Sequence, residues 1–212
     1  MSRRVVMGVP FLVLWLIAAA PAWSACPPKS AIHVLARSGK TRVYGVKRER
    51  VFEGAGGIYA CRYPRGKPHR LNRQGTFGLN DLVGFTFAGH FVAFEEDFGS
   101  AAGGAAYDVV VRDLRDGRLV VDLSVSERGG DLDDSAEALL LKPNGSVAWL
   151  ASTGPPGDSE DHGLYEIHVA DRDGVRMLDQ DTAIAPDSLR LSADHRHVSW
   201  LHANERRTAS IR

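Results

Sequence analysis

Two segments of the chain repeat the same pattern of apolar and polar residues, and this repeat constrains the fold more than any other feature. Residues 107–117 (YDVVVRDLRDG) align with residues 165–174 (YEIHVADRDG), with tyrosine, alternating apolar residues and aspartate at matching positions. Both segments end in Asp-Gly, a dipeptide that reverses a chain sharply. Each therefore predicts one strand and the turn of a β-hairpin, with returning strands at residues 118–123 and 175–178.

Another hairpin precedes each of these segments, and a similar one lies near the end of the chain. Short apolar strands recur at residues 91–94, 147–149 and 198–200, with a weaker copy at residues 59–61. Another alternating stretch comes before each of the first three, at residues 83–87, 138–141 and 189–191. The turn residues Pro143, Asn144 and Gly145 lie between two of these strands. Because β-branched residues alternate and no capped helical pattern is present, we predict an all-β chain.

Four strands per repeat is the layout of a β-propeller blade. Residues 139–149 (Leu-x-x-x-Pro-x-Gly-x-Val-Ala-Trp) and 165–171 (Tyr-x-Ile-x-Val-Ala-Asp) resemble the blades of TolB-like, WD40-like bacterial β-propellers. The chain after its leader also resembles small secreted actinobacterial proteins, which are mostly uncharacterised. The resemblance is clearest over residues 83–178. It implies a propeller-like fold and a role as an interaction platform, and it implies no enzymatic activity.

The length suggests about four antiparallel blades, of which we expect the first and last to be abbreviated. Residues 206–211 are predicted to form the final strand. Residues 32–35 and 41–46 are candidates to complete its sheet, because a shared terminal blade would suppress exposed strand edges. The array is then four-bladed, incomplete, or closed by a partner copy.

The first 25 residues have the three parts of a secretory signal peptide. Arg3 and Arg4 precede an apolar run from Val5 to Ala20, and small residues follow it. The run has 16 residues, fewer than the roughly 20 that a membrane span needs, and no second run of spanning length follows. We therefore expect a secreted or extracytoplasmic protein with one domain at residues 26–212. The alternative is an uncleaved N-terminal anchor.

The two cysteines, Cys26 and Cys61, are predicted to form a disulfide, since export leads to an oxidising compartment. A bacterial lipoprotein is the alternative, because Ser24-Ala25-Cys26 resembles the end of a lipobox and Cys26 would carry the lipid. Trp23 departs from that pattern, which normally has an aliphatic residue there.

Charge is balanced overall and polarised along the chain. Residues 26–73 carry a net charge of +10, and residues 74–212 carry a net charge of −12. Either the basic part packs beside the acidic remainder, or it forms a surface for a polyanion. A nucleic-acid partner is not expected, because the protein is predicted to be exported and has no nucleic-acid-binding motif.

In a four-stranded meander, the second-to-third connections and the blade-to-blade connections leave the same face. The two longest second-to-third connections are predicted at residues 98–106 and 153–163. Together these loops would gather an acidic rim, comprising Asp97, Glu127, Asp131, Asp133, Asp134, Asp158, Glu160, Asp161, Asp179, Asp181 and Asp187. Such a rim suits a protein or peptide partner, or calcium, although no EF-hand pattern is present. A solvated acidic surface is the simpler alternative.

No motif predicts catalysis, so we expect a binding protein without a cofactor rather than an enzyme. The chain lacks the Gly-x-Ser-x-Gly pattern of many serine hydrolases. His195, His197 and His202 are the only histidines spaced for zinc, and no further ligand accompanies them, so no metal site is predicted. A propeller hydrolase active on carbohydrates or esters is the enzymatic alternative. It would need two rim carboxylates about 5–10 Å apart.

Overall fold

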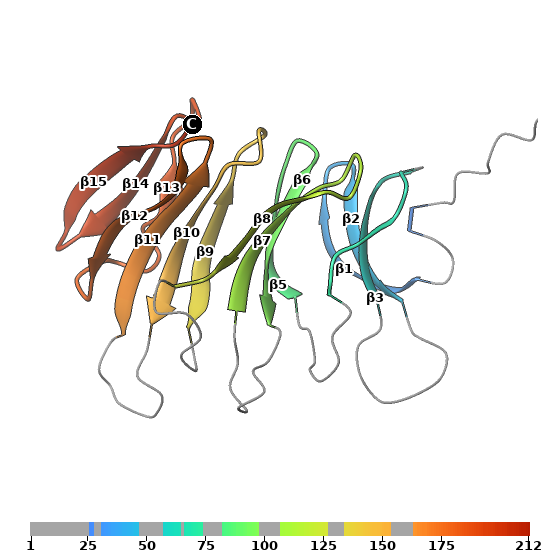
Figure 1. The fold of residues 1–212 in the computed structure, drawn as a ribbon, viewed down its shortest axis with the longest axis horizontal. Coiled ribbons are helices and arrows are strands. Elements are labelled where there is room, and N and C mark those ends of the chain that lie inside the picture. Colours follow the sequence, from blue (N-terminus) through green and yellow to red (C-terminus); the bar gives the residue numbers. More distant parts are fainter. Residues whose placement is uncertain are drawn as a thin grey trace, which may run out of the picture.

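The computed structural model describes residues 26–27, 31–46, 57–64, 66–73, 82–97, 107–126, 134–153 and 163–212. These residues form four antiparallel sheets, and in each sheet the strands follow one another in chain order. Figure 1 shows the sheets side by side in a row that follows the sequence, from the blue first sheet to the red fourth sheet. The all-β prediction is confirmed. The predicted leader, residues 1–25, lies outside the described residues.

The first sheet contains β1 (Ala31–Ser38), β2 (Thr41–Val46), β3 (Gly57–Arg62) and the short β4 (His69–Arg70). Pairing β1 and β2 with the last sheet, as the sequence suggested, is wrong. β1 pairs with β2, and β2 pairs with β3. The physical reason is proximity along the chain, because closing a short hairpin costs less entropy than joining the two ends of the array.

The second sheet contains β5 (Leu82–Ala88), β6 (Phe91–Asp97), β7 (Tyr107–Asp113) and β8 (Leu119–Ser124). The third sheet repeats this order with strands at corresponding places: β9 (Ser135–Leu141), β10 (Val147–Thr153), β11 (Leu164–Asp171) and β12 (Gly174–Asp181). The register repeats as well, since Asp97 pairs with Tyr107 and Ser152 pairs with Tyr165. The sequence repeat is therefore a structural repeat.

The fourth sheet has three strands: β13 (Arg190–Leu191), β14 (His197–His202) and β15 (Glu205–Ser210). Ala203 and Asn204 join β14 to β15, and both have positive φ angles, 49° and 65°. This is the geometry of a type I′ turn, which matches the twist of the two strands that it connects. Among the described residues, no strand pairs with the outer edge of β15 or links the fourth sheet to the first.

Apolar side chains fill the space between successive sheets. β6 is buried on both sides, with Val92 and Phe94 in the cluster toward the first sheet and Phe91 and Ala93 in the cluster toward the third. A third cluster joins the third and fourth sheets and includes Trp200 of β14. A middle strand that is apolar on both faces is expected when sheets stack on either side of it.

The end of the chain ties the fourth sheet to the third. The Lys142 ammonium donates to the Ile211 carbonyl at 2.8 Å, and the Arg212 amide donates to the Asp171 carboxylate at 2.8 Å. Lys142 and Asp171 lie beside the tight turns of the third sheet. These contacts place the last residues across those turns, so the fourth sheet is held by polar contacts as well as by its apolar cluster.

Cys26 and Cys61 form the predicted disulfide, with their Cα atoms 5.9 Å apart. The bridge lies on the outer face of the first sheet, where both cysteines pack with the buried Tyr44. Tyr59 stacks on Tyr44, with ring centroids 6.0 Å apart. The bridge thus attaches the start of the described chain to the end of the row of sheets.

The two ends of the strands differ. Short turns connect the strands at one end of the molecule, here called the turn end, at the top of Figure 1. At the opposite end, called the loop end, β2, β6 and β10 finish and β3, β7 and β11 begin. The longer connections in the sequence start and finish at this loop end, as expected for consecutive meanders.

Candidate functional site

One polar cluster at the loop end joins the first sheet to the second through a single arginine. Arg73, just after β4, contacts three carboxylates: those of Glu96 at 3.4 Å, Asp108 at 2.7 Å, and Asp122. The Arg73 amide also donates to Glu96 at 2.7 Å. Burial raises the pKa of Glu96, and these contacts with Arg73 oppose that rise. This Arg73 cluster joins the basic part of the chain to the acidic part.

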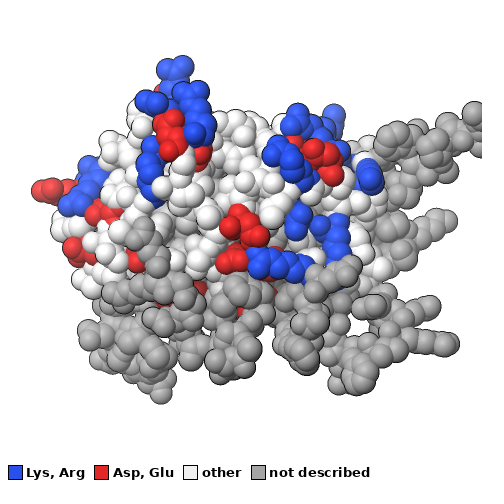
Figure 2. All heavy atoms as spheres, viewed as in Figure 1, with Lys and Arg blue, Asp and Glu red and all other residues white. Residues whose placement is uncertain are grey.

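Charges on the surface are also paired with charges of the opposite sign. Figure 2 shows Lys and Arg side chains next to Asp and Glu side chains in several clusters on the face in view. The charge polarity of the sequence is thus partly neutralised by contacts within the described part of the fold. For Arg73, packing beside the acidic remainder is the interpretation that the contacts support.

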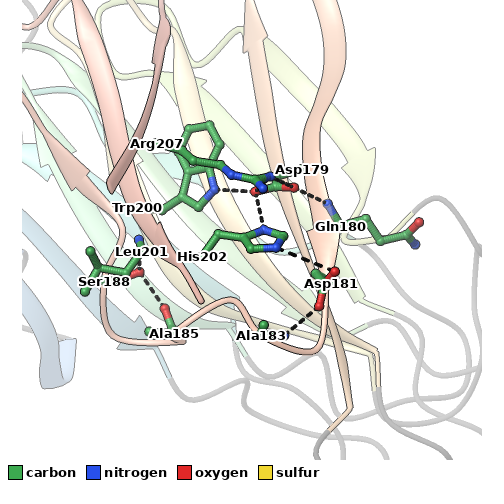
Figure 3. A network of polar contacts seen from close by, with 10 residues as sticks. All are labelled: Asp179, Gln180, Asp181, Ala183, Ala185, Ser188, Trp200, Leu201, His202 and Arg207. Carbon is green, nitrogen blue, oxygen red and sulfur yellow. Dashed lines mark hydrogen bonds and ion pairs between the residues drawn. The ribbon is translucent and has the colours of Figure 1, made fainter. Parts of the chain in front are cut away.

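A second polar cluster, the Asp179 cluster, lies at the loop end between the third and fourth sheets (Figure 3). The Asp179 carboxylate accepts hydrogen bonds from the Trp200 indole at 2.6 Å and from His202 Nδ1 at 3.0 Å. Arg207 donates to both of its oxygens, at 2.8 and 2.9 Å. Burial alone would raise the pKa of Asp179, but the donors Trp200 and His202 and the Arg207 charge hold it below its usual value.

The Asp179 cluster resembles part of a hydrolase site, yet its groups are arranged for structure. Asp179 is occupied by three donors, and His202 Nε2 faces Asp181 at 3.6 Å. The nearby Ser188 hydroxyl donates to the Ala185 carbonyl at 2.6 Å and accepts from the Leu201 amide at 2.9 Å. Among the described residues, no hydrogen bond joins a serine hydroxyl to His202. Within the Asp179 cluster, the Ser188 hydroxyl is therefore engaged by Ala185 and Leu201 and not by His202.

Two buried ionisable residues, Glu166 and His168, lie on the opposite face of the third sheet, toward the second sheet. Glu166 accepts from the Gln180 amide at 2.8 Å and lies 2.8 Å from His168 Nε2, and both Glu166 and His168 are buried. His168 also stacks on Trp149, with ring centroids 5.0 Å apart. A buried carboxylate with these partners stabilises the core of the third sheet.

Glu95 connects the second sheet to the third at the loop end. Its carboxylate accepts a 2.7 Å hydrogen bond from the Ala136 amide of β9, and its side chain is buried. Burial, with smaller contributions from Glu137 and Asp97, raises the pKa of Glu95 to about 7. The sequence analysis missed Glu95, Glu96 and Glu166. The available signal was an acidic residue within an otherwise apolar strand.

Five of the eleven predicted rim residues lie in the described part of the chain: Asp97, Asp134, Asp179, Asp181 and Asp187. Asp97 is partly buried at the end of β6, whereas Asp134 is buried and accepts a hydrogen bond from the Ser126 hydroxyl. This hydrogen bond joins the residue that precedes β9 to a residue just after β8. Six others lie outside the described residues: Glu127, Asp131, Asp133, Asp158, Glu160 and Asp161.

The three histidines considered for zinc are not gathered in one place. His197 begins β14 at the turn end, beside His195, and His202 ends the same strand at the loop end. The described residues contain no group of three or more metal-ligating side chains placed around one point.

In the same part of the chain, no helix has the length and apolar character needed to span a membrane.

A groove of about 510 Å³ lies at the turn end, between β8 and the turns of the third sheet. Its apolar walls include Val120 and Val121 of β8 and Val175 of β12. The sequence analysis did not anticipate this groove, because its walls come from strands about 50 residues apart in the chain. It lies at the opposite end of the molecule from the predicted rim.

No known protein-family model matches this chain, and no curated protein sequence is significantly similar to it.

Proposed function

We propose that this protein is an exported binding module, built of propeller-like blades, that captures a basic segment of a protein partner through carboxylates at its loop end. The observation that carries the proposal is the position of the connections. β6, β8 and β10 all end at the loop end. The acidic segments 127–134 and 158–161 follow β8 and β10 in the sequence. Variable loops on a rigid sheet scaffold are a common way to build a binding surface.

Three further features support this proposal. The structural repeat of four strands, with its tyrosine and Asp-Gly positions, favours a propeller-like arrangement of about four blades. The disulfide is compatible with export to an oxidising compartment, which the leader also predicts. The net charge of −12 over residues 74–212 favours a cationic ligand at the acidic segments.

The two alternatives receive less support. Lipid attachment at Cys26 would need the sulfur atom that is bonded to Cys61. A hydrolase would need a carboxylate pair that is free to act on substrate. Of the described loop-end carboxylates, Asp179 is held by Trp200, His202 and Arg207, and Glu96 by Arg73.

The test is binding of a fluorescent peptide of alternating lysine and glycine. We expect the combined variant Glu127→Gln, Asp131→Asn, Asp133→Asn to bind at least tenfold more weakly than the unchanged protein, with the contrast shrinking at high salt. Asp134 is left unchanged because it is buried. The matched control is the combined variant Asp116→Asn, Asp173→Asn, Asp194→Asn, which removes three charges from turn-end hairpins.

Equal weakening in both variants would overturn the loop-end assignment, because it would indicate a general charge effect. Peptide binding that is unchanged in the loop-end variant would do the same. Calorimetry with CaCl₂ distinguishes calcium binding from peptide binding. A stoichiometric calcium site that is lost only in the loop-end variant would replace the peptide proposal.

A further inference from the structure

The outer edge of β15 occupies a position where the other sheets have one more strand. In the second and third sheets, the third strands β7 and β11 pair on their outer side with β8 and β12. β15 is the third strand of the fourth sheet, and among the described residues no strand pairs with its outer side. The two N-terminal strands that the sequence suggested for this place belong to the first sheet.

The backbone groups on this edge can be assigned from the register. The Ile211 amide donates to the Arg196 carbonyl at 2.9 Å, so residue 211 directs its backbone groups toward β14. Because alternate residues of a strand direct these groups to opposite sides, Arg206, Thr208 and Ser210 direct theirs away from β14. Five of the six residues of β15 are exposed, so this edge is open to solvent.

The charge of the edge indicates the kind of strand that fits it. Three arginines, Arg206, Arg207 and Arg212, lie in or just after β15, against a single acid, Glu205. Arg207 is bonded to Asp179 and Arg212 to Asp173, so Arg206 is the arginine that this edge offers to a ligand. The Arg206 guanidinium lies on the face away from the third sheet, where it donates to the Ser199 hydroxyl at 3.1 Å. Two copies paired edge to edge would bring two positively charged edges together, which is unfavourable, whereas an acidic segment complements Arg206.

We propose that the outer edge of β15 binds an extended acidic segment of a partner protein as a fourth strand of its sheet. Backbone hydrogen bonds to Arg206, Thr208 and Ser210 supply affinity, and the Arg206 side chain selects acidic residues. This site is separate from the acidic loop-end connections and takes a ligand of opposite charge. The loop-end variant above therefore leaves it intact.

The probe is a seven-residue acetylated and amidated peptide of alternating valine and glutamate. Amide hydrogen exchange, followed by NMR, should slow at least tenfold for residues 206, 208 and 210 on saturation. Residues 205, 207 and 209 should change little, because their amides already face β14. Methylating the backbone nitrogens on one edge of the peptide should abolish the effect, and a valine–lysine peptide should bind at least tenfold more weakly.

Two variants test the two parts of the proposal. Thr208→Pro removes an outward amide without removing a bond to β14 and should weaken binding at least tenfold, whereas Thr208→Val should not. Arg206→Glu keeps the backbone edge and should reverse the preference toward the valine–lysine peptide. The reversal remains a test even if the proline variant folds poorly.

Three outcomes would overturn the proposal. One is peptide binding without protection of the alternate amides. Another is an equal affinity for the acidic and basic peptides. The third is protection of the same amides that rises with protein concentration in the absence of peptide, which would identify a second copy of the chain as the occupant.

Discussion

The two outermost sheets of the row are finished in different ways. On the outer face of the first sheet, Tyr44 is 1% exposed and the Cys26–Cys61 disulfide packs against it. The outer face of the fourth sheet is largely polar and carries Ser199 and Arg206. The outer face of the first sheet is therefore covered, around Tyr44, by chain that the disulfide holds in place. The outer face of the fourth sheet is exposed to solvent. In an open array of sheets, each terminal sheet needs an outer face that is either covered or polar.

Removing the disulfide should produce a large effect and would test the role of the bridge in covering the first sheet. Replacing Cys26 and Cys61 together with serine should lower the free energy of unfolding by about 3–4 kcal/mol, chiefly by freeing the unfolded chain. Urea denaturation measures the loss. Hydrogen exchange should accelerate first in β2 and β3, while β14 and β15 keep their protection. Equal acceleration at both ends would show that the bridge acts on the whole array.

The fourth sheet depends on a charged hydrogen bond where the third sheet uses a neutral one. Trp200 donates to the Asp179 carboxylate at 2.6 Å, whereas Trp149 donates to the Val125 carbonyl at 2.7 Å. We expect Trp200→Phe to cost about 2–3 kcal/mol and Trp149→Phe about 1 kcal/mol beyond their similar losses of apolar contact. Chemical denaturation of both variants measures the difference. A larger loss for Trp149→Phe would contradict the importance given to Asp179.

The interfaces on the two sides of the third sheet should respond to pH with opposite signs. Glu95, between the second and third sheets, has a pKa raised from 4.5 to about 7. The folded state then holds more protons than the unfolded state, so this contribution is full below pH 4.5 and is lost as pH rises to 7. Glu96 and Asp108, whose pKa values burial also raises, act in the same direction.

Asp179, between the third and fourth sheets, has a lowered pKa, so its contribution is present above pH 3.8 and is lost on acidification. Glu95→Gln keeps an acceptor for Ala136 and should remove roughly 2 kcal/mol of the decline in stability between pH 4.5 and 7.5. Asp179→Asn should instead flatten the decline below pH 4. Denaturation across this pH range measures both, and an unchanged slope in Glu95→Gln would refute its assignment.

The strands could be predicted from sequence because alternation, Asp-Gly turns and the repeat all point to the same hairpins. The partner of a strand is a different matter. The pattern of Thr41–Val46 suits the first sheet and the fourth equally, and only the three-dimensional register with β3 decides between them. Alternation specifies which face a side chain takes, but not which strand lies next to it.

The polar clusters were harder to predict for the same reason. Arg73 meets Asp108 across 35 positions of sequence, and no local pattern links these two residues. The acidic residues near the loop end were recognised as a group from their place after the strands. Which of them are buried depends on tertiary contacts, as Asp134 illustrates with its hydrogen bond from Ser126.

The smallest expected change in the free energy of unfolding comes from a substitution on the polar outer face of the fourth sheet. Its comparison with a substitution on the first sheet sharpens the contrast between the two outermost sheets. Ser199 of β14 and Tyr44 of β2 both lie on the second strands of their sheets and face away from the array. Ser199→Ala removes one solvent-exposed hydrogen bond and should change the free energy of unfolding by less than about 0.5 kcal/mol. Tyr44→Ala empties a buried position and should cost about 3–5 kcal/mol. Urea denaturation of the pair measures both, and similar losses would mean that the fourth sheet is also covered on its outer face.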